Sequence, residues 1–140
     1  IERYRTRISG PLLDRIDLHV QVPAVDYAQL ADIRRGESTA TIRQRVEQAR
    51  GVQRVRFRET PIRSNARISS KFLEQYATPD VASRSLLENA ITRMGLSARA
   101  YDRILKVSRT IADLADSENI QSAHVAEAIQ YRVLDRPATT

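Results

Sequence analysis

Glycine is scarce in this sequence, and no glycine-rich loop of the kind that holds a polyphosphate is present. The 140 residues include only four glycines and no G-x-x-x-x-G-K-[ST] run. Such a loop presents a series of backbone N–H groups to phosphate oxygens. No predicted strand ends in a pair of carboxylates suited to Mg²⁺ either. We therefore expect that this chain does not hydrolyse a nucleoside triphosphate by itself.

Cysteine, long apolar runs and clusters of metal ligands are also missing. Zero cysteines exclude a disulfide framework and thiolate metal sites, and fit a reducing cytoplasm. No apolar run approaches the roughly 20 residues that cross a bilayer. His19 and His124 lack the spacing of metal ligands, so we expect them to be ordinary histidines on a strand face and a helix face. We predict a cytoplasmic chain with no metal site and no membrane contact.

The excess positive charge is confined to the first half of the chain. The formal net charge is +6; residues 1–70 hold 14 Arg and 8 acidic residues, whereas residues 71–140 hold 9 of each sign. A basic half joined to a neutral half favours an anionic partner for the basic half. A solvated basic surface is the alternative explanation of the same composition.

The first 25 residues are predicted to contain a single strand. Leu18, Val20 and Val22 alternate with other residues, which is typical of a strand, and Pro23 closes it. A lone strand has no partner with which to form a ladder and is not stable in water. We expect it to fray or to lie against helices.

Residues 26–65 are predicted to be a basic helical segment followed by a linker. A short helix over residues 27–33 is possible, and residues 40–56 have a helical pattern with Arg43, Arg50 and Arg54 on one face. Thr60–Asn65 is the predicted linker, because Pro61 and the residue before it resist helix.

Residues 66–140 are predicted to be a bundle of helices with short loops. We expect Ser69 or Ser70 to cap a short helix that runs to Tyr76. The next helix is expected to open at Thr78-Pro79 and to run to Met94, with Gly95 after its end. Ser97 and Ser122 are the predicted caps of the last two helices. Met94 and Tyr101 are predicted to belong to the core.

Three blocks of this sequence resemble the ComM/YifB family of magnesium-chelatase-like AAA+ ATPases. The resemblance covers nearly the whole chain. It rests on SGPLLDRIDLHVQV (residues 9–22), SARAYDRILKVSRTIADL (residues 97–114) and HVAEAIQYR (residues 124–132).

This resemblance implies a mainly α fold, a helical lid bundle of an AAA+ ATPase preceded by a lone strand and a basic segment. Residues 1–25 would end the AAA+ core, residues 26–65 would form the basic segment and linker, and residues 66–140 would form the C-terminal lid. The chain starts at Ile1 without Met or a signal peptide, so we interpret it as a C-terminal piece of a larger ATPase. The full-length protein would bind ATP and Mg²⁺, form a homo-oligomeric ring and act on DNA as a branch-migration helicase in natural transformation. No cofactor is expected on this piece alone.

The resemblance also assigns roles to individual basic residues. Arg15 would be the arginine finger that reaches the ATP of a neighbouring subunit; an ion pair with Asp14 or Asp17 is the alternative. Arg99 would be the sensor-2 arginine, and it stands in the first turn of its helix, where the macrodipole disfavours a cation. Arg103 and Lys106 share its face and would also contact ATP phosphates, unless this face is merely solvated and paired with Asp102 or Asp113.

Two other functions remain open at this stage. The chain could be a stand-alone basic helical module that binds DNA, with Arg43, Arg50 and Arg54 as weak candidates for phosphate contacts. Little aromatic interleaving accompanies them, so base stacking on single strands is not indicated. A protein-interaction domain that regulates a chelatase is the third possibility, supported only by the shared fold.

Overall fold

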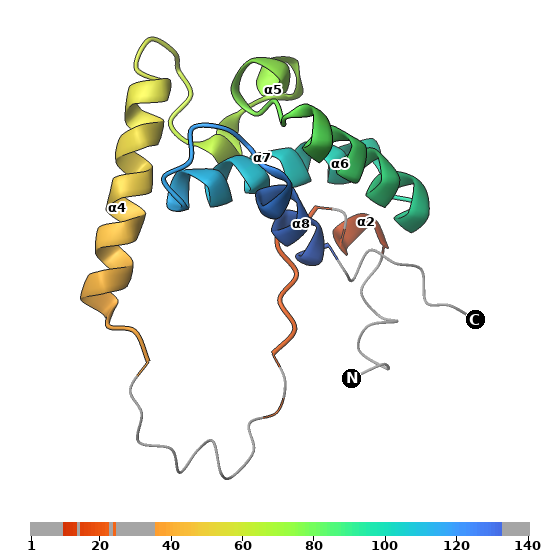
Figure 1. The fold of residues 1–140 in the computed structure, drawn as a ribbon, viewed down its shortest axis with the longest axis horizontal. Coiled ribbons are helices and arrows are strands. Elements are labelled where there is room, and N and C mark those ends of the chain that lie inside the picture. The colour runs from red at the N-terminus through yellow and green to blue at the C-terminus, as the bar shows by residue number, and fades with distance from the viewer. Residues whose placement is uncertain (1–9, 14, 23, 25–35, 133–140) are drawn as a thin grey trace.

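The computed structural model describes residues 10–13, 15–22, 24 and 36–132, and within them the chain is helical (Figure 1). This confirms the predicted mainly α class. The described elements are the short helix α2 (Gly10–Leu13), the helices α4 (Thr39–Arg56), α5 (Ser70–Tyr76), α6 (Val81–Met94), α7 (Ala98–Leu114) and α8 (Ser122–Gln130), and the 3-10 turn η1 (Asn65–Arg67).

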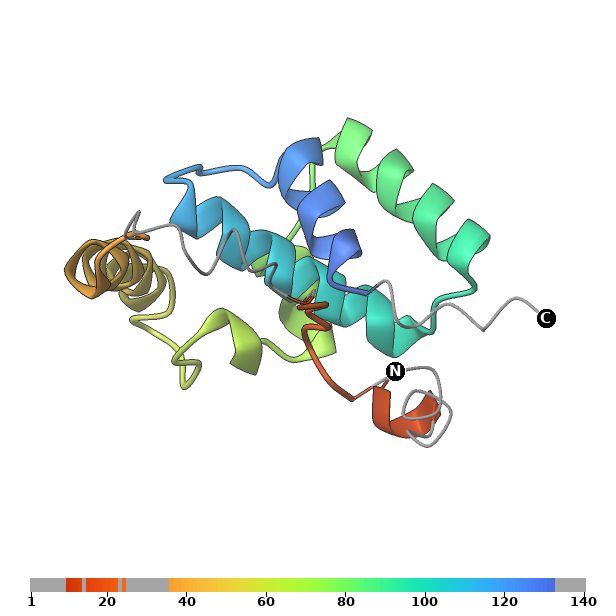
Figure 2. The same cartoon turned by 90° about the horizontal axis from the view of Figure 1, so that it is seen from below.

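Helix α7 is the centre of the fold. It runs through the middle of the molecule with α6 and α8 on one side, and α4 stands across its C-terminal end (Figures 1 and 2). α8 contacts both α7 and α6, whereas α4, α5 and η1 contact α7. The inward residues of α7 at spacings of three and four build the core, and Ile104, Leu105 and Ala112 are almost completely buried.

Helix α7 begins and α6 ends where the sequence predicts. The Ser97 hydroxyl accepts a hydrogen bond from the Ala100 N–H at 3.1 Å, so it caps α7. Gly95 ends α6 with a φ of 63°, a left-handed conformation that glycine adopts without steric cost. Met94 is buried and Tyr101 packs against the core, as predicted.

The predicted starts of α6 and α8 are wrong by one or two residues. α6 is capped by Asp80, whose carboxylate accepts the Ser83 N–H at 2.8 Å. Hydrogen bonding by the Ser83 side chain, and then by this N–H, lowers the pKa of Asp80. Pro79 instead forms a parallel bridge with Ile120, which keeps Thr78-Pro79 outside the helix. α8 is capped by Gln121 rather than Ser122, and the Gln121 N–H donates back to Nδ1 of His124 at 3.1 Å. This capping box gives His124 a structural partner.

The predicted strand over Leu18–Val22 does not form. These residues have no regular secondary structure, and Leu18, Val20 and Val22 are exposed. A strand needs a neighbour to take up its backbone hydrogen bonds, and no strand is present in the described part of the chain. One backbone group is instead held by a helix end, since the His19 N–H donates to the Tyr131 carbonyl at 2.9 Å. The helices thus hold the segment at His19, whereas Val20 and Val22 beyond it are exposed, so it is only partly in the position expected for a strand without a partner.

Two further sequence predictions concern the region around α4. The possible helix over residues 27–33 lies outside the described residues. α4 ends at Arg56, before Pro61, and the predicted linker Thr60–Asn65 follows. That linker is packed rather than loose, because Ile62 and Asn65 are buried. Among the described residues, no helix combines the length and apolar character needed to cross a membrane.

Candidate functional site

Arg15 lies in a turn directly after α2. The Arg15 and Ile16 N–H groups donate to the carbonyls of Leu12 and Leu13, each at 3.0 Å, which closes the turn and leaves Arg15 exposed. Asp17, one of the two carboxylates that could have neutralised Arg15, forms an ion pair with Arg103 instead. The other, Asp14, lies outside the described residues.

Residues 15–19, which we call the arginine segment, are docked on the C-terminal end of α8 and on α7. The guanidinium of Arg132 is almost completely buried and donates from Nη1 to the Ile16 carbonyl. The His19 N–H donates to the Tyr131 carbonyl, and Nε2 of His19 donates to the Leu13 carbonyl at 3.2 Å. Residues from all three blocks that carry the family resemblance therefore meet at one place.

The three basic residues predicted on α7 have different surroundings. Arg99 is exposed at the second position of the helix. Arg103 is partly buried and is engaged by Asp17. Lys106 is also partly buried, and this burial lowers its pKa, although nearby Asp102 acts in the opposite direction. Arg103 and Lys106 line a cavity of about 280 Å³ whose other walls include Leu18, Val107 and Ile111.

The arginines predicted on α4 lie apart from the residues on α7. Arg43, Arg50 and Arg54 are all exposed, and the N-terminal half of α4 extends away from the other helices (Figure 1). Their described interactions stay within α4: Arg54 lies 3.9 Å from Glu47, and Arg50 donates to Gln53 at 3.4 Å. The structure thus separates a basic surface on α4 from the one near the start of α7.

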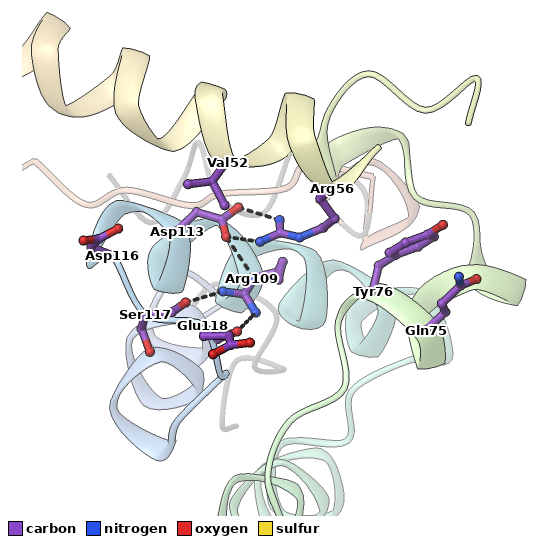
Figure 3. Close-up of a pocket in the computed structure, with 9 residues that line it drawn as sticks. All are labelled: Val52, Arg56, Gln75, Tyr76, Arg109, Asp113, Asp116, Ser117 and Glu118. Carbon is purple, nitrogen blue, oxygen red and sulfur yellow. Dashed lines mark hydrogen bonds and ion pairs between the residues drawn. The ribbon is translucent and has the colours of Figure 1, made fainter. Parts of the chain in front are cut away.

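A buried ionic network at the C-terminal end of α7 was not predicted from the sequence (Figure 3). Asp113, whose side chain is 0% exposed, accepts two hydrogen bonds from Arg56 at 2.8 and 2.5 Å. It accepts a third from Arg109 at 3.1 Å and a fourth from the Asn65 amide at 2.8 Å. Four donors use the full accepting capacity of a carboxylate.

The network lines the larger cavity, of about 450 Å³, but its charges are satisfied within the protein. Nη1 and Nη2 of Arg109 donate to the carbonyls of Glu118 and Ser117 at 2.7 and 2.6 Å (Figure 3). Burial lowers the pKa of Arg109, and the Asp113 carboxylate opposes that shift. Each of the three guanidinium nitrogens of Arg109 thus has an acceptor within the protein, so we assign this network to stability.

Only part of the network could be detected in the sequence. Arg109 and Asp113 are four residues apart on one helix, the spacing at which oppositely charged side chains meet. Arg56 is 57 positions from Asp113, and only the tertiary fold brings them together. The described residues contain no group of three His, Cys, Asp or Glu side chains that could hold a metal ion.

Comparison with protein families identifies relatives of this chain over most of its length. The model for the magnesium chelatase subunit ChlI C-terminal region matches residues 36–132. The model for the magnesium chelatase subunit ChlI matches residues 1–30. The boundary between the two matches lies just before α4.

Individual relatives show the same similarity. The chain is 42% identical over 137 residues to the competence protein ComM of Haemophilus influenzae, covering 97% of this chain and 26% of that protein. It is 40% identical to the protein YifB of Escherichia coli, with 96% of this chain and 26% of that protein covered. For the Rv2897c protein of Mycobacterium tuberculosis the identity is 39%, over 93% of this chain and 26% of that protein. The chain thus spans about a quarter of the length of these relatives.

Proposed function

The chain belongs to the magnesium chelatase subunit ChlI family, in the branch of ComM and YifB, and from this premise we propose that it supplies the lid and the arginine finger of a ring-forming ATPase. The observation that carries the proposal is the docking of the Arg15-bearing segment on the helix that bears Arg99. Both guanidiniums are exposed, as a phosphate contact requires.

Arg99 is proposed to contact the γ-phosphate of ATP bound to its own subunit. It lies in the first turn of α7, where the helix N-terminus also favours an anion. Lys106 lies on the same helix, and its pKa, lowered by burial, would return toward its usual value beside a phosphate. Because Arg103 is engaged by Asp17, we assign it to the docking of the arginine segment rather than to phosphate.

Arg15 is proposed to act on the ATP of the neighbouring subunit. A guanidinium offers forked donors that match phosphate oxygens, and it stabilises charge that develops during γ-phosphoryl transfer. Mg²⁺ bound with ATP would help to neutralise that charge. We assign no Mg²⁺ ligand to the described residues, because no suitable cluster of acidic side chains occurs among them.

The ring is further proposed to act on DNA as a branch-migration helicase in natural transformation. The name of the Haemophilus influenzae relative, competence protein ComM, supports this biological setting. The exposed arginines of α4, Arg43, Arg50 and Arg54, offer donors for phosphate contacts away from the proposed nucleotide site. Because these arginines lie apart from the proposed nucleotide site, they also favour the second candidate function, a basic DNA-binding module that works without ATP.

Subunit mixing tests the proposal and separates the two candidates. In the full-length protein, Arg15→Ala subunits are expected to be nearly inactive as ATPases, and so are subunits with a defective phosphate loop. Mixed rings should regain part of the turnover, because an intact Arg15 then faces an intact phosphate loop. Arg84→Ala, which removes an exposed arginine of α6, is the matched control and should keep full turnover.

Intact rings that fail to complement would show that Arg15 does not act across the subunit interface. Normal turnover of Arg15→Ala rings would favour the DNA-binding module instead. Ring assembly is checked by sizing in both cases.

A further inference from the structure

We infer that Arg132 and the Asp17–Arg103 pair are positioning residues, which fix the arginine segment to α7 and α8 so that a movement of the lid also moves Arg15. This inference rests on the proposed function, because it concerns how the proposed finger is coupled to the proposed sensor. Its evidence is a set of contacts that join residues far apart in the sequence.

The first contact is the burial of Arg132 at the end of α8. Arg132 is 1% exposed and donates to the Ile16 carbonyl, the group directly after Arg15. A buried guanidinium is costly unless its donors are satisfied. The Ile16 carbonyl supplies one acceptor for this buried charge. Displacing the arginine segment would remove that hydrogen bond, so the burial of Arg132 favours the docked position.

The second contact links the arginine segment to α7. The Asp17 side chain is 58% exposed and that of Arg103 is 20% exposed, so the ion pair lies at the edge of the surface. Arg103 is one helical turn from Arg99 on the same face of α7. Asp17, two residues from Arg15, is therefore tied to the helix that carries the proposed sensor.

A third contact shows that the docking is local. The His19 N–H is bonded to Tyr131, and His19 is buried, whereas Val20 and Val22 beyond it are 65% and 80% exposed. The segment is held from Ile16 to His19 and no further. The contacts thus act on the residues next to Arg15.

The consequence is a mechanical coupling between two ATP sites. If α7 moves with the nucleotide bound to its own subunit, the arginine segment moves with it and changes the position of Arg15 at the neighbouring site. A misplacement of about 1 Å can reduce turnover by about 10²-fold. The docking contacts therefore determine turnover without touching ATP.

A charge swap tests this inference in the full-length ATPase. Asp17→Arg and Arg103→Asp are each expected to lower kcat by about 10- to 100-fold, because Arg15 is no longer held in place. KM for ATP should change less than about threefold, since ground-state binding does not require Arg15. The double variant restores an ion pair and should regain most of kcat. Arg84→Asp, a charge reversal on the exposed face of α6, is the control and should change neither constant.

Failure of the swap to restore kcat would overturn the coupling and would favour a direct role of Arg103 at phosphate. Restored turnover is not expected from a residue that contacts phosphate, because Asp at position 103 repels it. Arg132→Gln is a supporting variant, expected to show the same split between kcat and KM.

Amide exchange of the 140-residue chain, followed by NMR, tests the docking independently of ATP hydrolysis. The His19 amide should be protected, and Arg103→Asp should increase its exchange at least about tenfold while the amides of α7 stay protected. Unchanged exchange in Arg103→Asp would contradict the docking itself. If docking is confirmed but Arg15→Ala rings hydrolyse ATP normally, the proposed function fails, and the coupling inference fails with it.

Discussion

The two ends of α7 use arginine for opposite purposes. Near the C-terminal end, Arg109 is buried, and its three guanidinium nitrogens donate to Asp113 and to the carbonyls of Ser117 and Glu118. Near the N-terminal end, Arg99 is exposed, one turn from the Arg103 that holds the arginine segment. Composition cannot separate the two ends, because each has basic residues. Burial separates them, since Arg109 is buried and Arg99 is exposed.

We propose that this difference divides the residues of α7 between stability at one end and activity at the other. The network around Asp113 ties α4 and η1 to α7 and holds the α7–α8 loop through two carbonyls. At the other end, Arg99 is exposed and Arg103 pairs with Asp17. We expect substitutions at the C-terminal end to change the free energy of unfolding, and substitutions at the N-terminal end to change turnover.

The largest expected effect is on turnover and comes from Arg99→Ala. In the full-length protein it should lower kcat for ATP hydrolysis by about 10³-fold or more, because the guanidinium that we propose to meet developing γ-phosphate charge is lost. The melting temperature should stay within about 2 °C, since Arg99 is exposed and outside the core. Steady-state kinetics and circular dichroism measure the two effects. A large loss of stability with unchanged kcat would contradict the assignment of Arg99 to turnover and would place it among the stabilising residues.

The next largest effect is on stability and comes from Asp113→Asn. This change keeps the shape of the side chain but leaves Arg56 and Arg109 without their shared carboxylate, and breaking a buried pair costs about 3–5 kcal/mol. Denaturant unfolding of the 140-residue chain measures the loss. Asp116→Asn is the matched control in the following turn, where the residue is exposed and has a φ of 53° that Asn tolerates. Equal effects of the two changes would show that the network does not stabilise the fold.

The smallest effect is expected from an exposed ion pair of the same residue types. Arg45 makes two hydrogen bonds to Glu37 at 2.9 and 3.0 Å, with side chains 50% and 40% exposed. Solvent screens such a pair, so Arg45→Ala should lower the free energy of unfolding by no more than about 0.5 kcal/mol. The same denaturant series measures it. A loss as large as that of Asp113→Asn would mean that burial does not set the contribution of an arginine here.

The helices were largely predictable from the sequence because their signals are local. The apolar spacing of α7, Ser97 before it and Gly95 after α6 each act within a few residues. The start of α8 was misplaced because Gln121 is an uncommon cap, and its reciprocal partner is a histidine rather than the usual Glu or Gln. The strand over Leu18–Val22 was wrongly predicted because an alternating pattern shows only that a segment suits a β-sheet. A strand also needs a neighbouring strand to bond with, and the pattern says nothing about that neighbour.

The candidate site was predictable only through resemblance. Sequence blocks identified Arg15 and Arg99, but no pattern showed that Asp17 would meet Arg103 or that Arg132 would be buried beneath Ile16. These contacts span more than 80 positions, and they depend on how α7 and α8 pack. The same is true of Arg56 and Asp113, whose pairing follows from the way α4 crosses α7.

The short bridge between Pro79 and Ile120 has a consequence for how α6 and α8 are aligned. Beside it, the Asp80 N–H donates to the Ile120 carbonyl at 3.2 Å, so the chain just before α6 is bonded to the chain just before α8. The Asp80 carboxylate meanwhile caps α6 through the Ser83 N–H. A single residue, Asp80, therefore both begins α6 and joins its start to the start of α8, a helix far along the sequence.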